Sequence, residues 1–287
     1  MDIFLLALFG GLALGCIYGL VGVSFNAIYN VCQLVNFAQG HFAMLAIVSW
    51  YFLIVVYKVP IAIALVIMIV VSMLFGVAIQ FLVAEPLIRR KIPLVSLVIA
   101  TLGAGLCAEG IAGIFTNFSI LLIEPVFGYM TIKVGPVGLL MQYVLIYGCT
   151  VFLCFFYWWF LEKTWIGLRL RAVGVNAEMA SLEGVNLNKI RCLAWCISAG
   201  ICAIAGWLIG PLIQSSALVG LSLVIYGFVA AAIGGFRSSF GPLLGGILIG
   251  LLISFSRAYL HPAAGELAMF LALILILTFR PKGLIVA

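Results

Sequence analysis

The side chains of this chain that could contact a solute are few, polar and set within long apolar runs. Glu109 is the one carboxylate that lies well inside such a run. A charged group at the centre of a membrane span costs about 2.5–3.5 kcal/mol on insertion scales, so it usually faces protein or water rather than lipid. Glu109 is therefore either a residue of a solute path or a carboxylate that is hydrogen-bonded between helices.

A second group of polar residues gathers where the first apolar run gives way to the next. Its members are Asn26, Asn30, Asn36, Gln39 and His41. No charged residue occurs between Asp2 and His41, so the segment 29–40 is too apolar for a free loop. We expect an irregular, partly embedded connection, which is tolerated only where it lines a cavity or is covered by protein. Together with Glu109, these residues are the candidates for a substrate pathway.

No pattern typical of an enzyme or a metal site is present in the sequence. The chain has two histidines and lacks the HExxH, GxSxG and P-loop patterns. Its carboxylates are scattered, and its eight cysteines form no CxxC pair and lie mostly inside apolar runs. We therefore expect a protein that is not an enzyme, with no catalytic residue, no bound metal and no ATP hydrolysis of its own.

The elements that must position these residues are membrane-spanning helices. Of the 287 residues, 67% are hydrophobic and 8% charged, compared with about 45–50% and about 25% in soluble domains. This composition excludes a soluble enzyme, a disordered chain and a disulfide scaffold. The net charge of +6 comes without a basic stripe interleaved with aromatic residues, so nucleic-acid binding is not expected.

Nine apolar runs predict an all-α integral membrane protein, a helical bundle of about 8–10 transmembrane segments, in a single domain over 1–287. A span needs about 20 residues. The last three runs are short for a bilayer, which leaves open that one or more is broken or only partly embedded. We expect the third run, 61–83, to be stopped by Glu85-Pro86 and Arg89-Arg90-Lys91. The runs are 3–28, 41–57, 61–83, 94–116, 137–160, 190–213, 219–236, 242–256 and 263–279.

The positive charges indicate the orientation of this bundle. With the N-terminus outside and nine crossings, most Lys and Arg residues are cytoplasmic, as the positive-inside rule requires. Only Lys58, Lys133 and Arg257 then face outward. The expected cytoplasmic residues are Arg89, Arg90, Lys91, Lys163, Arg169, Arg171, Lys189, Arg191, Arg237, Arg280 and Lys282.

Small residues at helix-contact spacing predict tight packing between the spans. In lipid, helices associate where glycine allows their backbones to approach closely. The GxxxG steps are Gly11, Gly15 and Gly19, then Gly206 with Gly210, Gly241 with Gly245, and Gly246 with Gly250.

The segment 164–191 is a polar island in this apolar chain. Val175, Met179 and Leu182 fall at i, i+4 and i+7, which predicts one apolar face of a short amphipathic helix. Small residues form a neighbouring face, namely Ala177, Ala180, Ser181 and Gly184. Such a helix either docks into a groove on a soluble partner or lies flat on the lipid headgroups.

Four motifs resemble, in order, those of one permease family. The segment 174–184, GVNAEMASLEG, resembles the coupling loop of ABC-transporter permeases. The segments 35–42 (VNFAQGHF), 232–236 with 241–246 (AIGGF and GPLLGG) and 280–284 (RPKGL) resemble further family signatures. Over essentially its full length, the chain resembles the LivH-type permease of the branched-chain amino acid ABC importer family.

The resemblance implies a subunit of a larger importer in a bacterial inner membrane. Its partners would be a homologous LivM-type permease, two cytoplasmic ATPases that carry ATP and Mg, and an extracytoplasmic solute-binding protein. A helix over 172–188 would act as a rigid lever in an ATPase groove. The coupling residues so implied are Gly174, Val175, Asn176, Ala177, Met179, Ala180, Ser181, Leu182 and Gly184.

One departure from the family pattern bears on the solute. The family usually has His and then an acidic residue in its N-F-A-H-G-E segment, where this chain has Gln39 and His41. The expected solute is therefore a branched-chain amino acid or a related amino acid, amide or organic acid. The alternative function is a secondary transporter driven by an ion gradient, which would need intramembrane ionisable residues such as Glu109.

Overall fold

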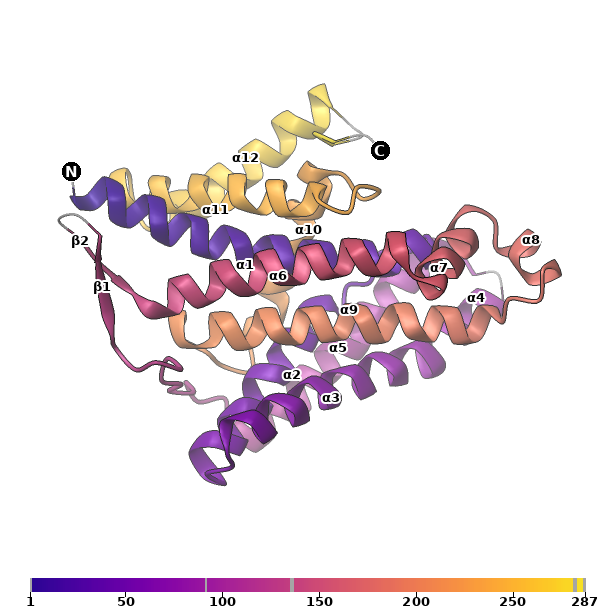
Figure 1. Ribbon diagram of the computed structural model, residues 1–287, viewed down its shortest axis with the longest axis horizontal. Coiled ribbons are helices and arrows are strands. Elements are labelled where there is room, and N and C mark those ends of the chain that lie inside the picture. The colour runs from indigo at the N-terminus through magenta and orange to yellow at the C-terminus, as the bar shows by residue number, and fades with distance from the viewer. Residues whose placement is uncertain (1, 91, 135–136, 281–282, 286–287) are drawn as a thin grey trace.

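Apolar helices make up most of the computed structural model, which describes residues 2–90, 92–134, 137–280 and 283–285 (Figure 1). Seven helical segments in these ranges are long and apolar enough to cross a membrane, and two shorter apolar helices, α10 and α12, accompany them. These segments match the nine predicted runs in number and order. The predicted all-α polytopic bundle is confirmed.

The elements follow one another with short connections, and two of the membrane helices continue through a π-helical turn. They are α1 (Asp2–Cys32), α2 (Gln39–Tyr51), the π-helix η1 (Phe52–Val56), α3 (Ile61–Ile79), the π-helix η2 (Gln80–Ala84), α4 (Glu85–Arg89), α5 (Leu94–Thr116), β1 (Thr131–Val134), β2 (Val137–Leu140), α6 (Met141–Lys163), α7 (Trp165–Val175), α8 (Ala177–Leu182), α9 (Leu187–Ile209), the 3-10 helix η3 (Gly210–Leu212), α10 (Val219–Gly234), α11 (Gly241–Tyr259) and α12 (Ala264–Phe279).

Two predicted boundaries are wrong. The fifth run does not begin a helix at residue 137, because β2 pairs antiparallel with β1 and α6 starts only at Met141. A short apolar run cannot be assigned to strand or helix from periodicity alone. The third run also extends past its predicted end at residue 83: Glu85-Pro86 does not stop it, and the helix ends at Arg89, where the predicted basic stop begins. Pro86 follows the π-helical turn and lies in the first turn of α4, where its missing N–H is tolerated, and the helix continues to Arg89.

The two ends of the bundle differ in charge. Figure 1 shows α4, α7 and α8 at one end and the N-terminus with the β1–β2 hairpin at the other. Arg89, Lys163 and Arg171 belong to elements at the first end, which we call the basic end. Lys91 and Lys282, also expected there, lie outside the described residues. The arrangement agrees with the predicted orientation, in which the basic end faces the cytoplasm.

Glycines bring α1 and α11 into backbone contact, as the GxxxG steps predict. A Cβ added at Gly11 would lie 2.8 Å from Cβ of Ser254, and one at Gly19 would lie 2.9 Å from Cα of Leu243. On the facing helix, a Cβ at Gly250 would overlap the backbone of Gly15. These contacts fix α1 and α11 side by side, while α2 lies buried among α3, α9 and α10.

Candidate functional site

The polar segment at the basic end forms two helices rather than one. Asn176 has an extended backbone (φ −154°, ψ 103°) and ends α7, and its side chain accepts a hydrogen bond of 3.1 Å from the N–H of Met179. This is the N-cap arrangement that Asn favours. After α8, Gly184 adopts a left-handed backbone conformation (φ +79°) in the connection to α9. The predicted single helix over 172–188 is therefore wrong.

The apolar side chains of this segment point away from the protein. Val175 is 87% exposed, Met179 61% and Leu182 81%. They do not form the predicted face of a single helix, because Val175 belongs to α7 and the other two to α8. The segment still presents three large exposed apolar groups, and Figure 1 places α8 at the basic end of the bundle.

The small residues of the segment do not form one docking face. Ala180 is only 6% exposed and faces the protein itself, so its predicted place on a docking surface is wrong. Ala177 is half-buried, whereas Ser181 and Gly184 are exposed. Helix α8 therefore packs on the rest of the protein through Ala180.

Helix α7 holds this segment firmly against the bundle. Leu170 and Val173 are buried. Gly174 lies so close to α1 that a Cβ would overlap the carbonyl oxygen of Asn30, and the Gln33 side chain donates a 3.4 Å hydrogen bond to the Gly174 carbonyl. The exposed groups of α8 are thereby linked to the end of α1.

The connection from α1 to α2 folds back into the protein. The helix continues through Cys32, so the irregular part covers 33–38 rather than the predicted 29–40. The side chain of Gln39 then lies level with Ser24, to which it donates a 2.6 Å hydrogen bond. Ser24 lies eight residues before Cys32, the last residue of α1, which is about 12 Å along the helix axis. The start of α2 therefore lies well inside the membrane part of the bundle.

A hydrogen-bonded network fixes this buried connection. Asn36 accepts from the Ala38 N–H (3.0 Å) and donates to the side-chain oxygen of Gln39 (3.2 Å). Gln39 donates to the hydroxyls of Ser24 and Ser198, each at 2.6 Å. The structure therefore brings Asn36 and Gln39 together, and it adds two serines that sequence reasoning missed. Their one sequence signal is a hydroxyl within an apolar run.

His41 and Glu109 form a pair between two helices. His41 Nε2 of α2 lies 3.1 Å from Glu109 Oε2 of α5. The imidazole is fully buried, and it is enclosed by Gly105 on α5 and Gly220 on α10. His41 Nδ1 has no hydrogen-bond partner among the described residues. His41 and Glu109, which the sequence indicates separately, thus lie together within the spans. Helices α2, α5 and α10 come close at this point.

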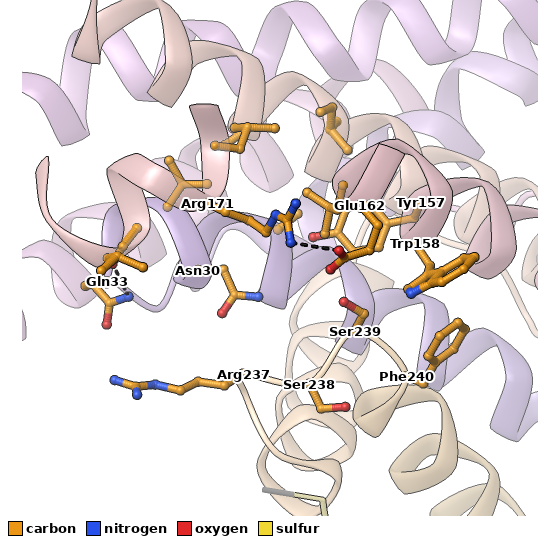
Figure 2. A pocket seen from close by; sticks show the side chains of 18 residues that line it. Asn30, Gln33, Tyr157, Trp158, Glu162, Arg171, Arg237, Ser238, Ser239 and Phe240 are labelled. Carbon is orange, nitrogen blue, oxygen red and sulfur yellow. Dashed lines mark hydrogen bonds and ion pairs between the residues drawn. The ribbon is translucent and has the colours of Figure 1, made fainter. Parts of the chain in front are cut away.

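The other two predicted pathway residues lie elsewhere. Asn26 is buried and donates a 2.7 Å hydrogen bond to the Ser238 carbonyl in the α10–α11 connection. Asn30 lines a cavity of about 790 Å³ at the basic end (Figure 2). The six predicted residues therefore occupy three places: the Gln39 network, the His41–Glu109 pair and the region near the α10–α11 connection.

This cavity is bounded by α1, α6, α7, α9 and the α10–α11 connection. In Figure 2, Arg171 and Glu162 point toward each other, and their ion pair measures 2.8 Å. The charged and hydroxyl-bearing residues of its wall are Tyr157, Glu162, Arg171, Arg237, Ser238 and Ser239.

A second buried carboxylate escaped the sequence analysis. Glu85 is 5% exposed and accepts hydrogen bonds from Arg89 (2.9 Å) and Gln80 (3.2 Å), with Arg191 of α9 at 3.6 Å. Its position next to Pro86 suggests the end of a helix, but its carboxylate links α4 to α9 through Arg191. Within the described ranges, no group of three or more His, Cys, Asp or Glu side chains could hold a metal ion.

Known proteins resemble this chain over nearly its whole length. It is 28% identical to the branched-chain amino acid permease BraD of Pseudomonas aeruginosa and 24% identical to LivH of Escherichia coli K12. Each comparison covers 98% of this chain and 95% of the relative. Among solved structures, PsaBC from Streptococcus pneumoniae in complex with Fab matches with a TM-score of 0.50 at 12% identity, over 95% of this chain and 91% of that chain.

The structural match supports the fold, and a family model identifies the lineage. The model that describes the permease component of branched-chain amino acid transport systems matches residues 7–279. These residues include every membrane helix, the polar segment at the basic end and the buried network. The chain therefore belongs to the family of branched-chain amino acid transport system permease components.

Proposed function

We propose that this chain is a transmembrane subunit of an ATP-driven importer, which moves a small solute by alternating access. Two ATPases carrying ATP and Mg, a LivM-type permease and an extracytoplasmic solute-binding protein would complete the assembly in a bacterial inner membrane. The solute would be a branched-chain amino acid or a related amino acid, amide or organic acid. The family and the relatives named for branched-chain amino acid transport support this assignment.

The observation that carries the proposal is the exposed apolar surface of α8 and the end of α7. Val175, Met179 and Leu182 stand clear of the spans at the basic end, which the charge distribution assigns to the cytoplasm. An apolar helix face of this kind fits a groove on a soluble partner. An ATPase that binds it would supply the energy for transport.

Force applied to α8 would reach the membrane part through α7. Gly174 packs on the carbonyl of Asn30, and Gln33 bonds to the Gly174 carbonyl, so α7 and the end of α1 would move together. The end of α1 leads directly into the connection that carries Asn36 and Gln39. A partner that binds α8 differently in its two states can thereby shift the bundle between two arrangements.

The solute path would pass the polar groups within the spans. His41 and Glu109 are the ionisable groups of this set, and α5 leaves much of its surface free of contacts within the chain. Asn26, Asn30, Asn36 and Gln39 would serve the same path or position its walls. Gln39 is a neutral amide where the family usually has histidine. This difference favours a solute whose recognition does not depend on a histidine at that position.

The test uses the complete transporter reconstituted in liposomes with ATP inside. Leu182→Asp should abolish ATP-driven uptake and release the ATPases on purification, because it places a charge on the docking surface. Leu260→Asp is the matched control. Leu260 is also an exposed leucine, but it follows the C-terminal end of α11, away from the basic end, so the ATPases should remain bound. Uptake that continues without any ATPase would overturn the proposal in favour of a secondary transporter.

A further inference from the structure

The cavity at the basic end has an unbalanced charge. Arg171 is paired with Glu162 at 2.8 Å, whereas Arg237 forms no ion pair or side-chain hydrogen bond with the residues that the structure describes. Both arginines line the cavity. In Figure 2, Arg171 points toward Glu162, whereas Arg237 extends from the α10–α11 connection away from that pair, with Asn30 between the two arginines in this view. The wall thus offers one net positive charge and several hydrogen-bond donors.

The donors around Arg237 are suited to an oxyanion. The backbone N–H of Gly241 already donates to the Ser238 hydroxyl oxygen (3.1 Å), which leaves the proton of that hydroxyl free to donate. Ser239 and the Asn30 amide line the same space. Arginine with hydroxyl and amide donors is a typical set for binding phosphate oxygens.

Aromatic rings close one side of this cavity. Trp158, near the basic end of α6, lies with its ring centre 6.4 Å from that of Phe240, just before α11. Tryptophan and other aromatic residues gather at the level of the lipid headgroups. The cavity therefore combines charged and hydroxyl-bearing groups with an aromatic part formed by Trp158 and Phe240.

From this geometry we infer that the cavity binds the phosphate group of an anionic phospholipid from the cytoplasmic leaflet. The phosphate would lie between Arg171 and Arg237, and the glycerol and first acyl carbons would contact Trp158 and Phe240. A volume of about 790 Å³ is ample for a headgroup with its glycerol. Basic pockets between membrane helices on the cytoplasmic side are the sites where such lipids bind.

A bound lipid would join two elements that the chain itself connects only loosely across this space. Arg171 belongs to α7, and Arg237 belongs to the α10–α11 connection. The phosphate would therefore bridge the helix that precedes α8 to the start of α11. This inference concerns a lipid site in a membrane protein and holds whether or not the chain couples to ATPases.

The experiment measures lipid retention by native mass spectrometry. The full chain, with any subunits that co-purify, is extracted into detergent and mixed with equal amounts of phosphatidylglycerol and phosphatidylcholine. The wild type should retain phosphatidylglycerol in preference. Arg237→Gln and Arg171→Gln should each lower that retention about fivefold, the effect of about one basic residue on lipid binding.

The matched control is Arg169→Gln, which removes the same charge from an exposed position of α7 that does not line the cavity. It should leave retention unchanged, and Arg237→Lys should keep most of it. Equal retention of the two lipids, or equal losses in the Arg169 and Arg237 variants, would overturn the inference. Displacement of the lipid by millimolar inorganic phosphate would also overturn it and assign the cavity to a soluble anion.

Discussion

The exposed segment around α8 and the buried network around Gln39 use polar and apolar residues in opposite ways. The segment turns Val175, Met179 and Leu182 toward its surroundings, while its backbone is organised by the Asn176 cap. The network encloses amides and hydroxyls in the membrane part, where they bond to one another. One region leaves its apolar groups exposed, and the other uses its polar groups to hold the chain together.

This difference separates two kinds of loss of function. A substitution in the network should lower stability before it changes transport, because its groups cannot find water as a substitute partner. A substitution on the α8 surface should leave stability unchanged and affect only binding. Stability and partner binding measured on the same variants therefore test the comparison.

The largest effect is expected for Gln39→Leu. It removes the hydrogen bonds that Gln39 donates to the Ser24 and Ser198 hydroxyls and leaves the buried Asn36 NH2 group without its acceptor. We therefore expect a loss of about 2 kcal/mol or more in the free energy of unfolding. Thermal unfolding in mild detergent would measure it. Gln214→Leu, which changes an exposed amide between η3 and α10, is the control and should change little. A Gln39→Leu protein as stable as the wild type would contradict the structural role of the network.

Ala180→Trp is expected to be the next most damaging change. Because Ala180 faces the protein, a large ring there cannot be packed without moving α8, at a cost of about 1–3 kcal/mol. Leu182→Trp, two residues away on the exposed side, should unfold at the wild-type temperature. If the two variants unfold alike, α8 does not lie against the bundle as described.

The His41–Glu109 pair should give a smaller, separable contribution. His41→Gln, Glu109→Gln and the double variant form a double-mutant cycle, and we expect a coupling energy of about 1 kcal/mol in the free energy of unfolding. Uptake by the assembled transporter would be measured in parallel. Normal uptake in Glu109→Gln would assign the carboxylate to helix packing, and lost uptake with normal assembly would place it on the path.

The smallest effect is expected for Glu162→Gln. Its ion pair with Arg171 is exposed on both sides, and such pairs contribute about 0–1 kcal/mol, less at high salt. At low ionic strength we expect no more than a slight decrease in thermal stability. In about 0.5 M salt, which screens exposed charges, the difference between the variant and the wild type should disappear. A large, salt-independent loss would mean that the pair is structurally essential.

The sequence predicted the parts of this fold that depend on hydropathy and local charge. Nine apolar runs were visible because each membrane helix needs its own apolar length, and α10 and α12 are short, as their runs were. The β1–β2 hairpin could not be predicted, because the apolar residues 137–140 are equally typical of a strand and of the start of a helix. The break at Asn176 does not follow from the apolar periodicity, because the i, i+4, i+7 pattern of Val175, Met179 and Leu182 continues across this N-cap residue.

The candidate site could be predicted only in part, because its geometry depends on contacts between distant residues. The sequence identified Gln39, His41 and Glu109 as polar groups in apolar surroundings. It could not show that Gln39 bonds to Ser198, 159 residues away, or that His41 reaches Glu109 on another helix. Ala180 was misplaced for the same reason, since one helix face looks like another until the surrounding bundle is known.

The glycine contacts between α1 and α11 carry a consequence for movement. Where Gly15 meets Gly250 and Gly19 meets Gly246, no side chains stand between the two backbones that could rotate to accommodate sliding. The two helices should then travel as one rigid piece, and any rocking of the bundle must be absorbed along other seams. A bulky residue at one of these glycines would need a matching loss of bulk on the opposite helix, so the two positions should change together in descendants of this chain.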